Sequence, residues 1–206
     1  MEVGPLAAVA AERERLLGLR WERFELRPIG ATLGAEVSGI DLTTPLAQDV
    51  VDELRRALLE HELLVFRDQP MTPAQHVALT ERFGPAGIHP LMAPNPDFPG
   101  VEHVERGLDA TGFENAWHSD ISWHPTPSMG TILHALVVPP TGGDTLFADA
   151  VAAYETLPGD LRARIEGRTA RHDFGRVVAH QKTPEELTDL RRRHPASHHP
   201  VVRTHP

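Results

Sequence analysis

Proline is the residue that most constrains how this chain can fold. The 206 residues include 19 Pro and 16 Gly. Proline ends helices and is excluded from central strands, and glycine favours turns. The sequence therefore predicts short helices and strands joined by many turns. The length corresponds to one domain at about 100–200 residues per domain, and we expect residues 1–22 to form an N-terminal extension of a domain spanning 23–206.

Charge and residue usage argue against several classes of protein. The formal net charge is −9, and the one basic cluster is Arg191–Arg193, whereas nucleic-acid-binding proteins carry a basic footprint. The sequence has no apolar run near the ~20 residues that span a bilayer, and its start lacks the basic region of a signal peptide. There is no Cys, which excludes disulfides and thiolate metal sites. We therefore expect a cytoplasmic protein that binds neither nucleic acid nor membranes.

The N-terminal half carries distinct signals for strands and helices. Alternating or continuous apolar runs predict strands, and apolar residues at the spacing of one helix face predict helices. The expected strands are 24–29, 32–37 and 63–66, and the expected helices are 43–61 and 73–84. Thr72, Pro73 and Gln75 form a capping box with proline at the first helical position, which marks the start of the second helix.

Strands are expected to dominate the middle of the chain, with helices around them. A Pro/Gly/Asn-rich loop covers 85–112. Strands are predicted at 101–104, 116–123, 131–138 and 168–174 and from His199 onward, and helices at 149–157, 158–167 and 184–193.

Trp117-His118-Ser119-Asp120 contains the first candidate site. In a strand, residues i and i+2 point to the same face, so His118 and Asp120 would present an imidazole nitrogen and a carboxylate oxygen to one point. These are two of the three ligands in the facial set that binds Fe(II). The alternative is a surface histidine hydrogen-bonded to an aspartate, because so short a pattern also arises by chance.

Two further segments carry candidate binding residues. Gly142 and Gly143 permit positive φ, so Thr145 could leave the turn with its hydroxyl directed at a carboxylate; an ordinary hairpin turn is the alternative. His89, in the long loop, could contact an anionic substrate, and a solvated loop histidine is the alternative.

Taken in order, six segments resemble the TauD/TfdA-type 2-oxoglutarate-dependent Fe(II) dioxygenases, which include taurine and alkylsulfate dioxygenases. The segments are Gly34–Leu42, Leu64–Gln69, Phe83–Pro90, Trp117–Asp120, Gly142–Tyr154 and His199–Pro206. The resemblance implies a mostly β fold with flanking helices, built on a double-stranded β-helix, or jelly-roll, core. It also implies that His118 and Asp120 bind iron, that Thr145 holds a carboxylate of 2-oxoglutarate, and that His89 faces the substrate.

The same resemblance sets expectations about chemistry and completeness. It implies hydroxylation of a small sulfonate-, sulfate- or ether-type substrate by O₂, with release of succinate and CO₂; a homo-oligomer is possible. Family members continue beyond the segment at His199–Pro206 and supply there a distal iron-binding His and a 2-oxoglutarate-binding Arg. We therefore expect an incomplete jelly roll that does not turn over alone. An inactive remnant of such an enzyme and a metal-independent module that binds a small acid are the alternatives.

Overall fold

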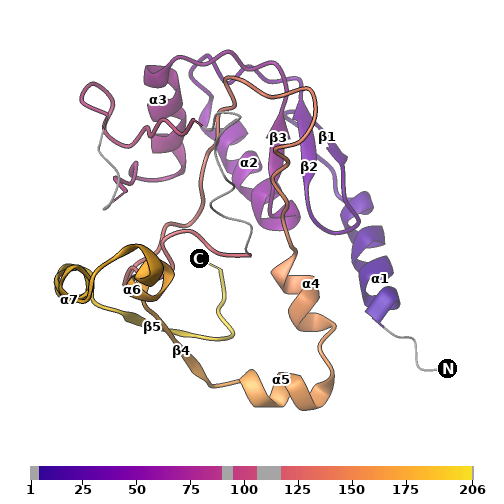
Figure 1. Ribbon diagram of the computed structural model, residues 1–206. Coiled ribbons are helices and arrows are strands. Elements are labelled where there is room, and N and C mark those ends of the chain that lie inside the picture. The colour runs from indigo at the N-terminus through magenta and orange to yellow at the C-terminus, as the bar shows by residue number, and fades with distance from the viewer. Residues whose placement is uncertain (1–4, 90–94, 106–116, 206) are drawn as a thin grey trace. The chain divides into compact units, whose positions relative to one another are not determined.

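The computed structural model describes residues 5–89, 95–105 and 117–205 of the chain (Figure 1). The described residues form two compact units. Met1–Val104 with Ile132–Leu157 make up the first unit, and Glu105–Thr131 with Pro158–Pro206 make up the second. Among the described residues, no helix has both the length and the apolar character needed to cross a membrane.

A three-stranded sheet organises the first unit. Its strands are β1 (Glu25–Pro28), β2 (Ala35–Ser38) and β3 (Leu64–Phe66), in the order β1-β2-β3. β1 and β2 are antiparallel, whereas β2 and β3 are parallel. A parallel pair needs a crossover connection, and helix α2 (Gln48–His61) supplies it. The predicted strands and the crossover helix are confirmed, although α2 begins after Pro45 rather than at Thr43.

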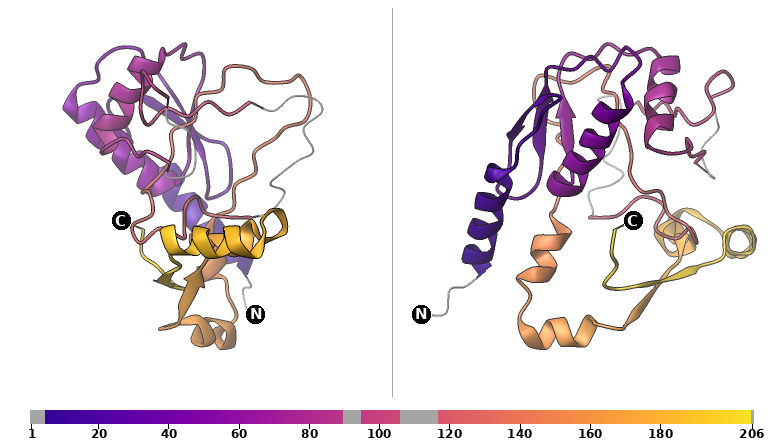
Figure 2. Two further views of the ribbon diagram at one scale, coloured as in Figure 1. Left: turned by 60° about the vertical axis from the view of Figure 1, so that its left-hand side comes forward. Right: turned by 180° about the vertical axis from the view of Figure 1, so that it is seen from behind.

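The core of this unit lies between α2 and the sheet, which run beside each other in Figures 1 and 2. Leu54 and Ala57 of α2 are fully buried and pack with Val37 of β2 and with Phe24. Full burial of a leucine side chain contributes about 1.5–3 kcal/mol. The helical spacing of apolar residues on α2 therefore places one face of that helix against the sheet.

Helix α3 (Pro73–Phe83) follows the sheet and begins as its sequence predicts. The Thr72 hydroxyl accepts from Gln75 N, and the Gln75 side chain accepts from Thr72 N, so the capping box is formed in both directions. Leu79 on this helix is buried with Leu42 and Met71 in a second apolar cluster. The cap and the cluster together fix where α3 starts and which face it buries.

Two other helices belong to the first unit. Helix α1 (Pro5–Gly18) buries Leu16, and its Arg15 forms ion pairs with Glu12 and Glu60 at 2.7 and 2.6 Å. Helix α4 (Ala150–Glu155) is capped by Asp149, whose second carboxylate oxygen accepts from the Thr32 hydroxyl. Asp149 thereby joins the start of α4 to the turn that precedes β2.

The second unit is built around a pair of antiparallel strands. Its elements are α5 (Gly159–Ile165), β4 (Thr169–His172), α6 (Phe174–Val177), η1 (Ala179–Gln181), α7 (Pro184–Arg193) and β5 (Ser197–Pro200). β4 and β5 pair antiparallel. The buried carboxylate of Asp173 forms ion pairs with Arg171 and Arg191 at 3.2 and 3.3 Å, which ties the end of β4 to α7. The helices predicted at 158–167 and 184–193 and the strand at 168–174 are confirmed.

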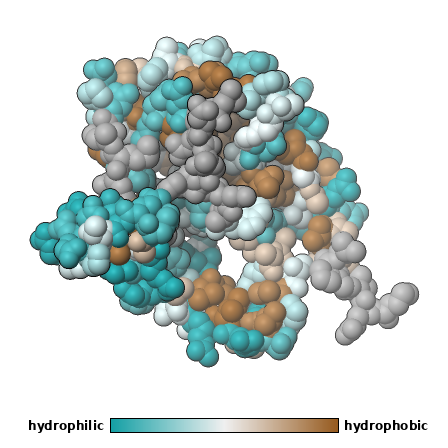
Figure 3. Space-filling model, viewed as in Figure 1, coloured by the Kyte–Doolittle hydropathy of each residue, from teal (hydrophilic) through white to brown (hydrophobic). Residues whose placement is uncertain are grey.

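The strands predicted in the middle of the chain are wrong within the described residues. Residues 101–104, 117–123 and 131–138 are in no regular strand, and residue 116 lies outside the described ranges. A strand is stable only when it pairs within a sheet, and here Leu133 and Val137 are 74% and 90% exposed. Figure 3 shows apolar residues reaching the surface on one face of the molecule. The described residues thus contain more helix than strand, and the jelly-roll core stays an expectation from the resemblance.

Candidate functional site

His118 and Asp120 lie together in the second unit. His118 Nε2 is 3.3 Å from Asp120 Oδ1, and the two side chains are 53% and 62% exposed. The other carboxylate oxygen of Asp120, Oδ2, accepts from the Thr131 hydroxyl at 3.3 Å. The two oxygens therefore have different surroundings, one beside an imidazole nitrogen and one beside a hydroxyl.

The turn that begins at Asp120 is held by unusual backbone geometry. Ile121 has φ +40°, a value in the left-handed region that β-branched residues rarely adopt. His124 N donates to Ile121 O at 2.8 Å and closes the turn. Trp123 is buried, with its ring 5.2 Å from Phe174 and 5.3 Å from His194. The exposed Asp120 is therefore attached to a well-packed turn rather than to the strand that its sequence predicts.

Three histidines from the C-terminal part of this unit contact the segment 117–131. His199 Nε2 donates to His124 O at 3.0 Å, and His205 Nε2 donates to Met129 O at 2.8 Å. His172 Nδ1 is 3.1 Å from Ser122 Oγ. His199 is partly buried, whereas His205 is exposed, and both attach the C-terminal segment to the main chain of residues 124–129.

Thr145 and His89, the other candidate residues, belong to the first unit. Thr145 is exposed and follows Gly142 and Gly143, which have φ +77° and +74°; the turn therefore uses the backbone freedom that its glycines predict. His89 lies in the loop after α3, where its backbone N–H donates to Glu102 Oε1 at 3.0 Å. The structure thus brings His118 and Asp120 together in the second unit. Thr145 and His89 belong to the first unit.

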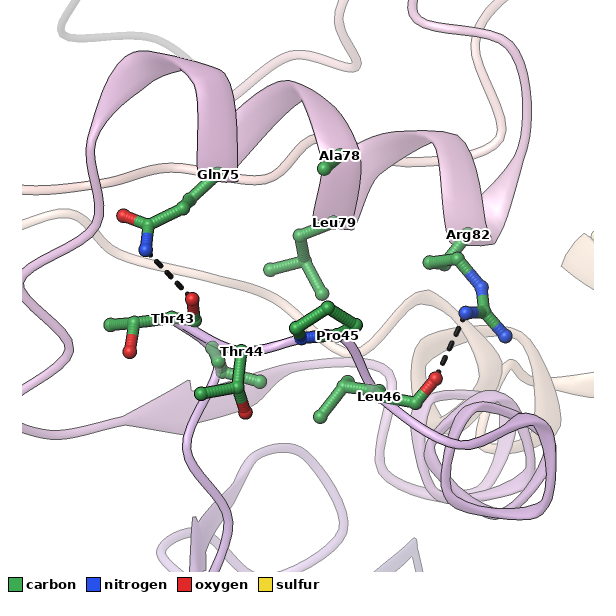
Figure 4. Close-up of a pocket in the computed structure, with 9 residues that line it drawn as sticks. Thr43, Thr44, Pro45, Leu46, Gln75, Ala78, Leu79 and Arg82 are labelled. Carbon is green, nitrogen blue, oxygen red and sulfur yellow. Dashed lines mark hydrogen bonds between the residues drawn. The ribbon is translucent and has the colours of Figure 1, made fainter.

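A pocket of about 170 Å³ lies elsewhere in the first unit, between residues 42–46 and α3 (Figure 4). Its polar side chains already have partners. Gln75 Nε2 donates to Thr43 O at 2.7 Å, and Arg82 Nη1 donates to Leu46 O at 2.9 Å. These bonds attach α3 to the loop that leads to α2. The pocket includes none of the candidate site residues.

The donor chemistry of His118 and Asp120 fits a divalent metal. A neutral imidazole nitrogen and a carboxylate oxygen are donors that Fe(II) accepts in the set of two histidines and one carboxylate. Within residues 5–89, 95–105 and 117–205, no group of three or more His, Asp or Glu side chains is arranged to hold a metal ion. The described part of the chain therefore offers a pair of ligands rather than a complete facial set.

Comparison with known proteins identifies the family. Residues 25–206 match the family described as "Taurine catabolism dioxygenase TauD, TfdA family". The chain belongs to this family of 2-oxoglutarate-dependent dioxygenases, as the order of its sequence motifs predicts.

Two relatives illustrate the range of substrates within the family. The chain is 38% identical over 159 residues to the (S)-phenoxypropionate/alpha-ketoglutarate-dioxygenase of Sphingobium herbicidovorans, a match that covers 73% of this chain and 54% of the relative. It is 34% identical over 201 residues to the alkylsulfatase of Acinetobacter baylyi, covering 90% and 60%. The chain thus spans between half and two thirds of the length of these curated relatives.

Solved structures agree with the family assignment. A taurine dioxygenase from Burkholderia xenovorans aligns with a TM-score of 0.72 and 33% identity, covering 90% of this chain and 60% of that one. The enzyme AAD-2, solved in complex with Mn(II) and N-oxalylglycine, aligns with a TM-score of 0.69 and 26% identity, covering 90% and 70%. The fold of this chain is therefore similar to that of the taurine dioxygenases, and one similar protein binds a divalent metal.

Proposed function

We propose that this chain carries two ligands of an Fe(II) centre, His118 and Asp120, in a dioxygenase that uses 2-oxoglutarate and O₂ to hydroxylate a small organic substrate. The observation that carries the proposal is that these residues lie in a chain of the TauD/TfdA family. The 3.3 Å approach of His118 Nε2 to Asp120 Oδ1 is compatible with a shared metal, and it is also what the alternative, a surface histidine hydrogen-bonded to an aspartate, would give, so metal titration decides between them. We infer that the double-stranded β-helix of the proposal is completed by polypeptide equivalent to the part of the relatives that this chain does not match.

The resemblance to the TauD/TfdA family gives each candidate residue a role that its chemistry permits. His118 and Asp120 would hold the metal through one nitrogen and one oxygen. The Thr145 hydroxyl would donate to a carboxylate of 2-oxoglutarate, and His89 would face an anionic substrate. When bound, the metal and 2-oxoglutarate supply the oxidising chemistry, and the polypeptide binds, orients and excludes water.

The proposed substrate is a small sulfonate, sulfate ester or aryloxy acid. The support is the printed activity of the relatives, which act on phenoxypropionate and on sulfate esters. The imidazole of His89 can donate a hydrogen bond to an oxygen of an anionic substrate. A panel of such acids, screened for succinate release in the presence of Fe(II), 2-oxoglutarate and O₂, would identify the class.

The metal proposal is tested by titrating the chain with Co(II) under argon and measuring heat. We expect His118→Ala to abolish the binding isotherm, because it removes one of two donors. His180→Ala is the matched control, since His180 is an exposed histidine of the same unit, and it should bind as the wild type does. Equal affinity in all three proteins would refute the metal assignment.

The cosubstrate proposal is tested at Thr145 in a Co(II)-loaded version of the protein extended by polypeptide equivalent to the part of the relatives that this chain does not match. We expect Thr145→Ala to weaken 2-oxoglutarate binding by about 1–3 kcal/mol, the range for a hydrogen bond to a charged group, with Thr145→Ser close to the wild type. A titration curve for Thr145→Ala that overlays the wild type would mean that Thr145 is only a turn residue.

Succinate production tests whether the 206-residue chain is active alone. We expect no succinate above the free-iron background, because the chain carries only part of the proposed site. Turnover by a soluble, monodisperse sample would overturn that expectation and show a self-sufficient enzyme. Binding of 2-oxoglutarate that is independent of metal would support the small-acid-binding module instead.

A further inference from the structure

Asp120 has two carboxylate oxygens, and the structure gives them different neighbours. Oδ1 lies 3.3 Å from His118 Nε2, so it is the oxygen positioned to share a metal with that imidazole. Oδ2 accepts a hydrogen bond from Thr131 Oγ1, also at 3.3 Å. A carboxylate rotates easily about its terminal torsion, so a partner on Oδ2 limits which oxygen faces His118.

The chain between Asp120 and Thr131 is held at two points. The turn that follows Asp120 is closed by the hydrogen bond from His124 N to Ile121 O and anchored by buried Trp123. Further along, His205 Nε2 donates to Met129 O, two residues before Thr131. Thr131 therefore belongs to a segment whose main chain is held in place, as a positioning residue requires.

We propose that Thr131 is a positioning residue for the metal site: its hydroxyl holds Oδ2 of Asp120 so that Oδ1 is presented beside His118 Nε2. The inference rests on the proposed function, because it requires His118 and Asp120 to bind a metal. Carboxylates that ligate metals are commonly hydrogen-bonded by a neighbouring group, and loss of such a partner reduces metal affinity by about 10–100-fold. Nothing in the sequence pattern singles out Thr131, which lies 11 residues after Asp120.

The experiment measures Mn(II) affinity of the 206-residue chain by electron paramagnetic resonance of the free ion. Thr131→Val removes the hydroxyl and keeps the shape of the side chain, and we expect the Kd for Mn(II) to rise about tenfold or more. Thr131→Ser restores the hydroxyl and should stay near the wild-type affinity. Thr126→Val is the matched control, because the Thr126 hydroxyl lies in the same segment but contacts His124 rather than Asp120.

A second readout distinguishes positioning from a general structural effect. With Co(II) bound, Thr131→Val should change the visible ligand-field spectrum, whereas Thr131→Ser and Thr126→Val should leave it unchanged. In an Asp120→Ala background, Thr131→Val should have no further effect on Mn(II) binding. Thr131→Ala provides a second variant that lacks the hydroxyl should the valine variant fold poorly.

The possible failures of the two proposals can be told apart. If His118→Ala weakens Mn(II) binding but Thr131→Val and Thr131→Ala bind as the wild type does, the role of Thr131 is overturned and the metal site stands. If His118→Ala and Asp120→Ala both bind Mn(II) as the wild type does, the metal site is overturned and the role of Thr131 falls with it.

Discussion

Two stretches of this chain have similar apolar content but different structures. Residues 24–84 form three strands and two helices around fully buried residues such as Leu54. Residues 131–147 form no helix or strand, and Val137 there is 90% exposed. The first stretch contains both partners of each strand pair, with a helix to cover the sheet. The second has apolar residues with strand character but no paired strand among the described residues.

The difference shows that a sequence with strand propensity forms a strand only where a partner strand is available. β propensity largely measures packing against neighbouring strands and burial, so it has no effect where a partner is missing. A helix makes its hydrogen bonds within its own segment, which is why α2, α3 and α7 lie where their sequences predict. The relatives are longer than this chain.

The largest test of this comparison removes apolar atoms from each stretch. Leu54→Ala should reduce the free energy of unfolding by about 2–5 kcal/mol, because it leaves a cavity in a buried site. Val137→Ala should change it by less than about 0.5 kcal/mol, as is usual for surface substitutions. Urea unfolding followed by circular dichroism measures both. Comparable losses in the two variants would show that residues 131–147 are packed after all.

A smaller effect is expected at the start of α3. Thr72→Ala removes the side-chain acceptor for Gln75 N and should cost about 1 kcal/mol of stability, the typical value for an N-cap. Thr72→Ser keeps the hydroxyl and should stay within a few tenths of a kcal/mol of the wild type. The same urea titration applies, and a Thr72→Ala variant as stable as Thr72→Ser would mean that packing of Leu79, rather than the cap, fixes the start of the helix.

The smallest effect concerns His61, a buried histidine at the end of α2 whose Nε2 has no hydrogen-bond partner among the described residues. Burial is the main cause that lowers the pKa of His61; Glu60 and Glu12 oppose the shift, and Arg15 adds to it. The unfolded chain then binds a proton near pH 6.5 that the folded chain does not. Stability is therefore unaffected above that pH and falls as the pH decreases from about 6.5 towards the lowered pKa.

The variant His61→Leu isolates this contribution. We expect its urea midpoint to fall less than that of the wild type between pH 7.5 and pH 5.5, because leucine has no proton to gain. The difference between the two pH dependences is the quantity to measure, since other groups titrate equally in both proteins. Parallel curves would indicate that the pKa of His61 is the same in the folded and unfolded chains, and would contradict the lowered pKa.

The candidate site follows the same division between local and tertiary information. His118 and Asp120 are only two residues apart in the sequence, so the sequence predicted that their side chains lie close together, and they do. The predicted strand was wrong, because residues 117–119 have no regular secondary structure and a turn begins at Asp120. Thr131 could not be found from the sequence, because its contact with Asp120 depends on how the whole segment 117–131 is folded.

The sequence by itself determined the features whose interactions lie within a few residues: the capped helices and the glycine turn before Thr145. It also determined the ordered motifs of the TauD/TfdA family. Only the tertiary structure decided which strand-like segments became strands, because strand pairing joins residues far apart in the chain. It also decided that His199 and His205 bind main-chain carbonyls at His124 and Met129. The residues next to a histidine in the sequence do not show whether its imidazole will contact water, a metal or a distant carbonyl, because the partner depends on how the chain packs.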